Sequence, residues 1–179
     1  RNSTGVYLEA AISGPSFKVR NWGIIQDDPG LYVQELKKIL DDDCDILIST
    51  GAVSMGVHDF VRPVLESLGA EIHFHKCAIR PGKPVLFASI NYRGKIRFIF
   101  GVPGNPVSTA VGLKFFVKPF LDFLLLGSTE KPIRASLSSD TKKPEGLKCF
   151  FKAKVDFQQA ETRVEALQGQ ASFMVSPLI

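Results

Sequence analysis

The stretch DILISTGAVSMGVHDF, residues 45–60, decides the fold predicted for this chain. It begins with a short apolar run bounded by loops, which is typical of a buried parallel strand. A loop with glycines at positions 51 and 56 follows, and it leads into a segment at residues 60–68 that predicts a helix ending at Gly69. A buried strand, a glycine-containing loop and a helix in this order indicate an α/β sheet.

The segments on both sides of this stretch continue the alternation. The expected helices span residues 3–12, 29–41, 60–68 and about 107–126. The expected strands span residues 17–25, 45–49, 71–77, 85–90 and 96–100, with a hairpin turn at residues 91–94. Asp28 is expected to cap the second helix, with Pro29 at its first position. This alternation favours a mostly parallel sheet covered by helices on both faces.

The character of the sequence changes near residue 127. Residues 127–132 have the composition of a linker, and the segments after them are short, with alternating apolar and polar residues and no predicted helix. We therefore expect an α/β domain at residues 1–127 and a small β domain at residues 132–179. Because so short a segment has little core of its own, we expect an incomplete domain. The chain begins at Arg1 without Met, so we also expect part of a longer protein.

Composition argues against several classes of protein. The chain has 179 residues, of which 45% are hydrophobic and 22% charged, as in ordinary globular proteins. The net charge of +4 is too small to indicate nucleic-acid binding, and no apolar run reaches the roughly 20 residues of a membrane span. Three separated cysteines without a CxxC pair fit a reducing compartment. No dinucleotide, Walker or hydrolase motif occurs, and the histidines lack metal-ligand spacing.

Three loops follow predicted strands, at residues 50–59, 78–84 and 101–108. Ligands of open α/β sheets bind beyond the carboxyl ends of the strands, so we expect the loops to form one site. In the first loop, glycines allow close backbone approach to an anion at the helix N-terminus, and Asp59 supplies a carboxylate that suits a hard cation. An ordinary turn with Asp59 as a helix cap is the alternative.

The second and third loops carry complementary groups. Arg80 and Lys83 lie on a backbone stiffened by two prolines, and Lys76 is close by in the sequence. Fixed cations of this kind suit phosphate or an oxyanion such as molybdate, although a solvated basic turn is the alternative. The third loop, PGNP at residues 103–106, forces a tight turn into a helix whose first turn contains Ser108. A strand-to-helix connector is the alternative there.

Three motifs in order carry a resemblance to a known family. They are DILISTGAVSMGVHDF at residues 45–60, IRPGKPVLFA at residues 79–88 and FGVPGNPVS at residues 100–108. Together with GIIQDDP at residues 23–29 they resemble the molybdopterin molybdotransferases, or molybdenum insertases, a family that includes the E domain of gephyrin. The resemblance runs over residues 1–127 and continues more weakly beyond them.

The resemblance implies a fold and a reaction. It implies a three-layer α/β/α molybdopterin-binding domain, followed by a β-barrel domain that this chain would only begin. The implied reaction inserts molybdate into adenylylated molybdopterin (molybdopterin that carries an AMP moiety), releases AMP and uses Mg²⁺. The implied protein is a cytoplasmic homodimer that follows a molybdopterin adenylyltransferase in the pathway. Neither nucleic acid nor a membrane is expected as a partner.

Residue roles follow from the resemblance by motif. Asp59 is implied as the catalytic acid linked to magnesium. The implied cradle for the pterin phosphate consists of Gly51, Ser54 and Gly56. The implied contacts to molybdate or phosphate are Arg80 and Lys83, with Lys76 beside them. The implied opposite wall consists of Pro103, Gly104, Asn105, Pro106 and Ser108.

Some residues depart from the family pattern. Ala52 stands where the family usually has glycine, Val57 stands where it usually has an acid, and Asn2 lies where its N-terminal acidic motif is expected. We therefore expect this chain alone to bind pterin or nucleotide weakly and not to turn over.

Three other functions stay open. An adenylyltransferase of the same fold would carry a different first loop and no C-terminal β domain. A non-catalytic scaffold module fits the departures from the family pattern. A competence- or damage-inducible-type hydrolase fits the second loop less well.

Overall fold

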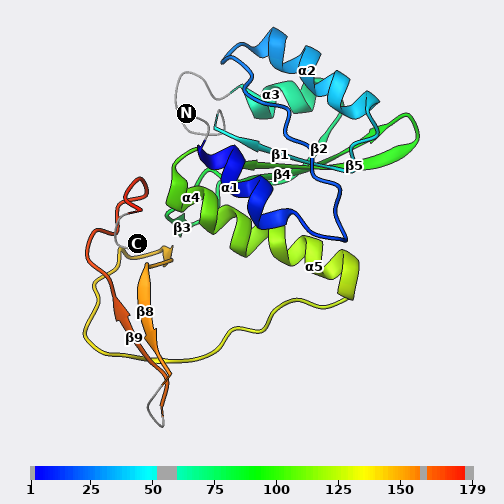
Figure 1. Cartoon of the computed structure of the whole chain (residues 1–179). Coiled ribbons are helices and arrows are strands. Elements are labelled where there is room, and N and C mark those ends of the chain that lie inside the picture. Colours follow the sequence, from blue (N-terminus) through cyan, green and yellow to red (C-terminus); the bar gives the residue numbers. More distant parts are fainter. Residues whose placement is uncertain (1–2, 52–59, 158–160, 176–179) are drawn as a thin grey trace.

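An α/β body and a set of C-terminal β strands make up the protein (Figure 1). The computed structural model describes residues 3–51, 60–157 and 161–175. The helices are α1 (Ser3–Ile12), α2 (Pro29–Asp41), α3 (Val61–Ser67), α4 (Pro106–Gly112), the π-helical turn η1 (Leu113–Val117) and α5 (Lys118–Leu126). The strands are β1 (Ile46–Thr50), β2 (Glu71–His75), β3 (Ile79–Arg80), β4 (Leu86–Tyr92), β5 (Lys95–Val102), β6 (Ser136–Leu137), β7 (Lys148–Cys149), β8 (Ala153–Asp156) and β9 (Arg163–Ala166).

The main sheet has the strand order β1-β5-β4-β2. Strands β1 and β5 are parallel, whereas β5 with β4 and β4 with β2 are antiparallel. The prediction of a mostly parallel sheet is therefore wrong for the described residues. The cause is the hairpin between β4 and β5, because a two-residue connection joins only antiparallel strands. Its residues Arg93 and Gly94 have φ values of 52° and 81°, as such a turn requires.

Helices cover both faces of this sheet, as predicted (Figure 1). Neighbouring residues of β5 point to opposite faces, so Ile99 and Phe100 enter two different cores. The Ile99 core includes Leu36 of α2 and Leu65 of α3. The Phe100 core is closed by side chains of α1, α4 and the segment that follows it. The result is a layered arrangement with the sheet in the middle.

Local signals placed most helices correctly. The Asp28 side chain accepts a hydrogen bond of 2.8 Å from the Leu31 N–H, so the predicted cap of α2 is confirmed. The predicted helix at residues 107–126 exists but contains the π-helical turn η1. Pro119 follows this turn and has no N–H to donate to the carbonyl four residues earlier, which favours a local widening of the helix.

The strand expected at residues 17–25 is wrong. Of these residues, only Phe17 makes a β bridge, an isolated one with Gly14. Gly23 has a φ of 80° and donates its N–H to the Asn21 side chain, which is turn geometry rather than extended backbone. The segment's apolar side chains also lack a common buried face, since Ile24 is 76% exposed. Among the described residues, no partner strand lies beside this segment.

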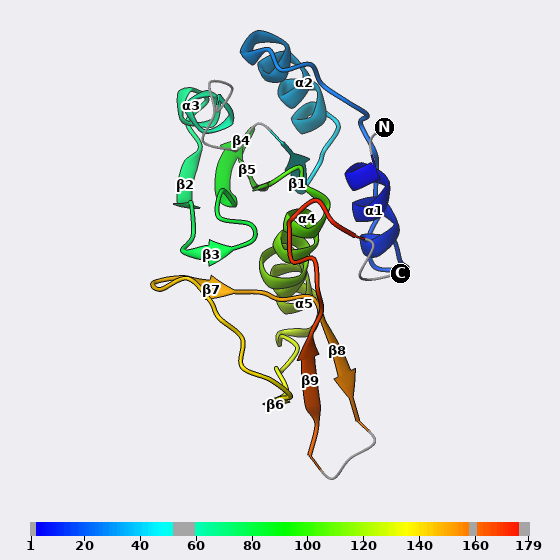
Figure 2. The same ribbon diagram turned by 90° about the vertical axis from the view of Figure 1, so that its left-hand side faces the viewer.

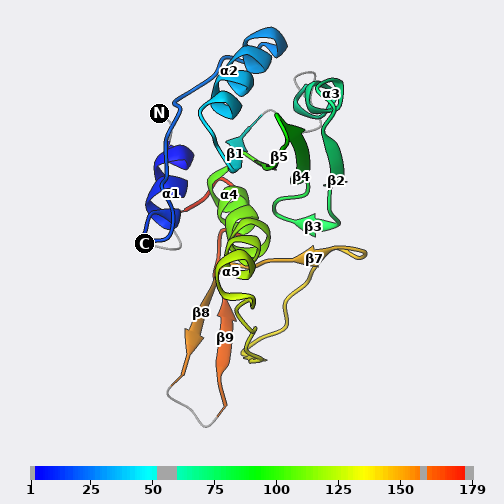
Figure 3. The same ribbon diagram turned by 90° about the vertical axis from the view of Figure 1, so that its right-hand side faces the viewer.

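The described residues from 132 onward, here called the C-terminal unit, form small sheets. Strands β6, β9 and β8 make a three-stranded sheet, and β7 pairs with β3 of the α/β body. Figures 2 and 3 show β7 running beside β3, with β8 and β9 extending away from the main sheet. These described strands do not close into a barrel, so the expected β-barrel is not confirmed. Within the described residues, no helix is long and apolar enough to cross a membrane.

A cluster of ion pairs at the beginning of β5 makes the stability of the fold depend on pH in the acid range. Hydrogen bonds from Lys95 and from the buried Arg97 lower the pKa of Asp43 to about 2. Because the folded pKa lies below the unfolded one, the ionised carboxylate stabilises the fold above about pH 4, and this contribution is lost as the pH falls through about 2. We expect Asp43→Asn to lower the free energy of unfolding at pH 7 more than at pH 2.

Urea unfolding of both proteins across this pH range measures the difference. Asp43 has a φ of 60°, which asparagine tolerates as well as aspartate does, so the comparison isolates the charge. A difference between the two proteins that is independent of pH would contradict the assignment.

Candidate functional site

The strand register brings the three predicted loops to one edge of the sheet. Ser49 of β1 lies opposite Gly101 of β5, Gly101 lies opposite Leu86 of β4, and Leu86 lies opposite His75 of β2. This row crosses the sheet just before β1, β5 and β2 end. The loops that follow these strands therefore leave from the same edge, as the sequence predicted.

The first loop is described only at its beginning. Gly51 has a φ of 82° and donates its N–H to the Val102 carbonyl at 3.1 Å, so it turns the chain toward the third loop. A Cβ at Gly104 would lie 3.6 Å from the Gly51 Cα, which shows how closely the two loops approach. The predicted residues Ser54, Gly56 and Asp59 lie outside the described residues, as do Ala52 and Val57.

The second loop folds back on itself. The Lys76 N–H donates to the Val85 carbonyl at 3.0 Å, and the Cys77 N–H donates to the Lys83 carbonyl at 2.9 Å. Gly82 has a φ of 101°, and a Cβ there would lie 3.4 Å from Val111 of α4. The loop is thus held by its own backbone and pressed against a helix, as its prolines indicated.

The cations of this loop point to an anionic ligand. Arg80 and Lys83 are exposed, and neither forms a salt bridge with another described residue. Exposed cations on a fixed backbone keep their donors for a phosphate or another oxyanion.

The third loop is tied to the helix that follows it. The Thr109 hydroxyl donates to the Pro103 carbonyl at 2.6 Å, and the Thr109 N–H donates to the Asn105 carbonyl at 2.8 Å. Ser108 is buried, with 4% of its surface exposed. Helix α4 approaches β5 very closely, because a Cβ at Gly112 would lie 2.8 Å from a methyl group of Val102.

Sequence reasoning missed Ser172, which contacts this loop from the C-terminal unit. Its carbonyl accepts a hydrogen bond of 2.9 Å from the Val107 N–H, and its hydroxyl accepts one of 3.1 Å from the Asn105 side chain. The Val107 N–H, at the start of α4, is therefore used in a contact within the protein. Ser172 lies outside all three motifs, and a contact through its main-chain carbonyl leaves no trace in the sequence.

The described residues do not form a metal site on their own. No group of three histidine, cysteine or acidic side chains among them is arranged to hold an ion. Asp59, the predicted magnesium ligand, lies outside that part of the chain.

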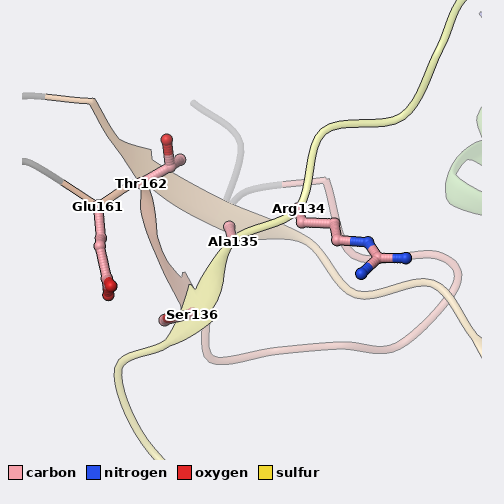
Figure 4. Close-up of a pocket in the computed structure, with 5 residues that line it drawn as sticks. All are labelled: Arg134, Ala135, Ser136, Glu161 and Thr162. Carbon is pink, nitrogen blue, oxygen red and sulfur yellow. The ribbon is translucent and has the colours of Figure 1, made fainter.

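A pocket elsewhere is not part of this site. It lies in the C-terminal unit and is lined by Arg134, Ala135, Ser136, Glu161 and Thr162. Figure 4 shows the Arg134 and Glu161 side chains pointing away from each other, so they do not converge on a ligand. None of the predicted site residues lines it.

Comparison with known proteins fits this arrangement of loops. Residues 1–122 match the protein family described as "Probable molybdopterin binding domain". The chain belongs to this family. The matched region spans the main sheet and all three loops, so the resemblance inferred from the motifs is confirmed.

Relatives within this family carry a common name, molybdopterin molybdenumtransferase. The relative from Synechococcus elongatus is 36% identical over 186 residues, which cover 99% of this chain and 45% of the relative. The relative from Bacillus subtilis is 39% identical over 164 residues, covering 89% of this chain and 36% of the relative. One from Staphylococcus aureus is 31% identical over 167 residues, covering 92% and 38%. The chain thus spans less than half the length of these relatives.

Proposed function

We propose that this chain is the molybdopterin-binding part of a molybdopterin molybdotransferase. The reaction inserts molybdate into adenylylated molybdopterin and releases AMP. The observation that carries the proposal is the strand register, by which the strands before the three motif loops all end at one sheet edge. The shared name of relatives that align with 89% to 99% of this chain supports the same reaction.

In this proposal, each loop contributes different groups to ligand binding. Arg80 and Lys83 neutralise the oxyanions of molybdate or of the phosphates, and Lys76 adds charge at the same edge. Gly51 and Gly104 let the first and third loops approach each other closely, and glycines without side chains leave the backbone accessible to a ligand. Asp59 acts as the catalytic acid and, with Mg²⁺, completes the site; Ser54 and Gly56 complete the first loop. Pro103, Asn105, Pro106 and Ser108 form the opposite wall.

The proposal extends to the whole protein. The whole protein is a cytoplasmic homodimer that receives its substrate from a molybdopterin adenylyltransferase. Within this chain, the domains are residues 1–127 and, at residues 132–179, the beginning of a β-barrel. A dimer is supported by the apolar end of α5, where Phe123 and Leu126 are 60% and 73% exposed. Apolar groups gathered on a surface in this way favour cover by another subunit.

Calorimetric titration with AMP and with molybdate, each with and without Mg²⁺, tests the proposed function. We expect both ligands to bind weakly and Mg²⁺ to strengthen AMP binding. Asp59→Asn removes a negative charge without changing the size of the side chain, so it should abolish the effect of Mg²⁺ but leave molybdate binding in place.

Each other outcome has a definite meaning. A magnesium effect that survives in Asp59→Asn would remove the metal role from Asp59. Absence of binding for both ligands would contradict the proposal for this chain. Transfer of AMP from ATP to molybdopterin would indicate the adenylyltransferase reaction instead.

A further inference from the structure

The C-terminal unit contacts the second loop of the site through its first arm, residues 148–152. Strand β7 pairs in parallel with β3, which includes Arg80. The Lys148 N–H donates to the Ala78 carbonyl at 2.9 Å, and the Phe150 N–H donates to the Arg80 carbonyl at 2.8 Å. The main chain of Arg80 is therefore fixed from outside the α/β body.

A second arm, residues 169–174, contacts the third loop. It contains Ser172, which accepts hydrogen bonds from the Val107 N–H and from the Asn105 side chain. The two arms thus form hydrogen bonds with two different loops of the same site.

Lys152 joins the two arms to each other. Its side chain is 7% exposed, and its Nζ donates to the carbonyl oxygens of Gly169, Ala171 and Met174, at 3.3 Å for Ala171 and 2.7 Å for Met174. Gln170 adds a reciprocal pair, because its side chain bonds both the N–H and the carbonyl of Lys152, each at 2.9 Å.

The chemistry of the ammonium group explains why a lysine lies here. A buried charge is tolerated only when its donors are satisfied, and an ammonium has three of them. Three carbonyls of one short segment supply the partners, so the ammonium ties this segment to the first arm. An apolar side chain of the same length would leave these carbonyls facing each other without a donor.

We propose that Lys152 is a positioning residue, which fixes Asn105 and the first turn of α4 through Ser172. This inference rests on the proposed function, because it assigns the third loop to the ligand site. It makes the C-terminal unit a supporting part of the site rather than an appended domain.

Amide hydrogen exchange of the whole chain tests the positioning role without any ligand. In Lys152→Met we expect the Val107 amide to exchange about tenfold faster, because its acceptor on Ser172 is displaced. The Thr109 amide, which bonds within its own loop, should change little. Lys154→Met removes the same charge from an exposed position of β8 and serves as the matched control. Unchanged Val107 exchange in Lys152→Met would overturn the proposal.

Two further variants keep the test decisive. If Lys152→Met unfolds the C-terminal unit, seen as lost protection of β8 and β9, Gln170→Ala loosens the same arm without removing the buried charge and should still accelerate Val107 exchange. Lys152→Arg retains N–H donors and should recover part of the protection.

Ligand titration separates positioning from mere stabilisation. We expect Lys152→Met to weaken AMP or molybdate binding about fivefold, with unchanged protection of β1 and β5, whereas Lys154→Met should bind like the wild type. Unchanged affinity in a variant with accelerated Val107 exchange would refute the role in the site. If the wild type binds neither ligand, the proposed function fails, while the exchange result still decides whether Lys152 positions the loop.

Discussion

Replacing Phe100 by alanine is expected to lower the free energy of unfolding by about 3–5 kcal/mol, enough to unfold a marginally stable domain. Phe100 lies in β5 with 2% of its surface exposed. Its ring centroid is 4.5 Å from that of Phe87 and 5.4 Å from that of Phe120, so it joins two strands of the sheet to α5. Removing the ring leaves a cavity between layers that cannot collapse freely.

Chemical denaturation followed by circular dichroism measures this effect. The matched control is Ile96→Ala, because Ile96 lies on the same strand but is 55% exposed, and its loss should cost less than about 1 kcal/mol. Equal losses of unfolding free energy in the two variants would show that the stability of the Phe100 core does not depend on the Phe100 ring. Because Gly101 follows Phe100 at the sheet edge, we also expect the destabilised variant to bind ligands less tightly.

Elements with local signals could be predicted from the sequence. The Asp28 cap, the turn at Arg93 and Gly94 and the strand at residues 46–50 all depend on residues that are close in the chain. This strand is half-buried rather than buried as predicted, because it is an outermost strand of the sheet. The direction of strand pairing was predicted less well. Alternating helices and strands suggested parallel neighbours, but the hairpin and the return through the second loop make β4 antiparallel to both β5 and β2.

The prediction of a strand at residues 17–25 was wrong for a related reason. Its composition suits a strand, yet a strand needs a partner, and partners are chosen by distant parts of the chain. The positive φ of Gly23 and the stacking of Arg20 on Trp22, at 4.8 Å, give the segment local contacts instead.

In the site, too, features set by neighbouring residues were predicted and contacts between distant residues were not. Its three loops were found because each is a contiguous motif at the end of a strand. Ser172 and Lys152 were missed because their contacts are largely with main-chain groups and they lie more than 40 residues from the third loop. Contacts of this kind depend on the path of the backbone, and no residue pattern encodes them.

Replacing Arg80 by alanine is expected to weaken molybdate or AMP binding about 10- to 100-fold, the loss expected for a charge-assisted hydrogen bond to an anion. In the structure, the Arg80 side chain can be removed without disturbing the fold, so a loss of binding would not result from unfolding. The Arg80 side chain is exposed, whereas its main chain is held by the Phe150 N–H, so the variant should keep the loop and its stability within about 0.5 kcal/mol.

Titration calorimetry with three variants shows whether geometry or charge decides the binding at Arg80. Arg80→Lys keeps the charge but loses the planar fork of donors, so its affinity should fall between those of wild type and Arg80→Ala. Arg20→Ala removes an equal charge beside Asp42, at the opposite edge of the sheet, and should bind like the wild type. Similar losses in Arg80→Ala and Arg20→Ala would mean that net charge alone attracts the ligand. Wild-type affinity in Arg80→Ala would remove the second loop from the site, because its backbone would be intact and only the proposed anion contact would be missing.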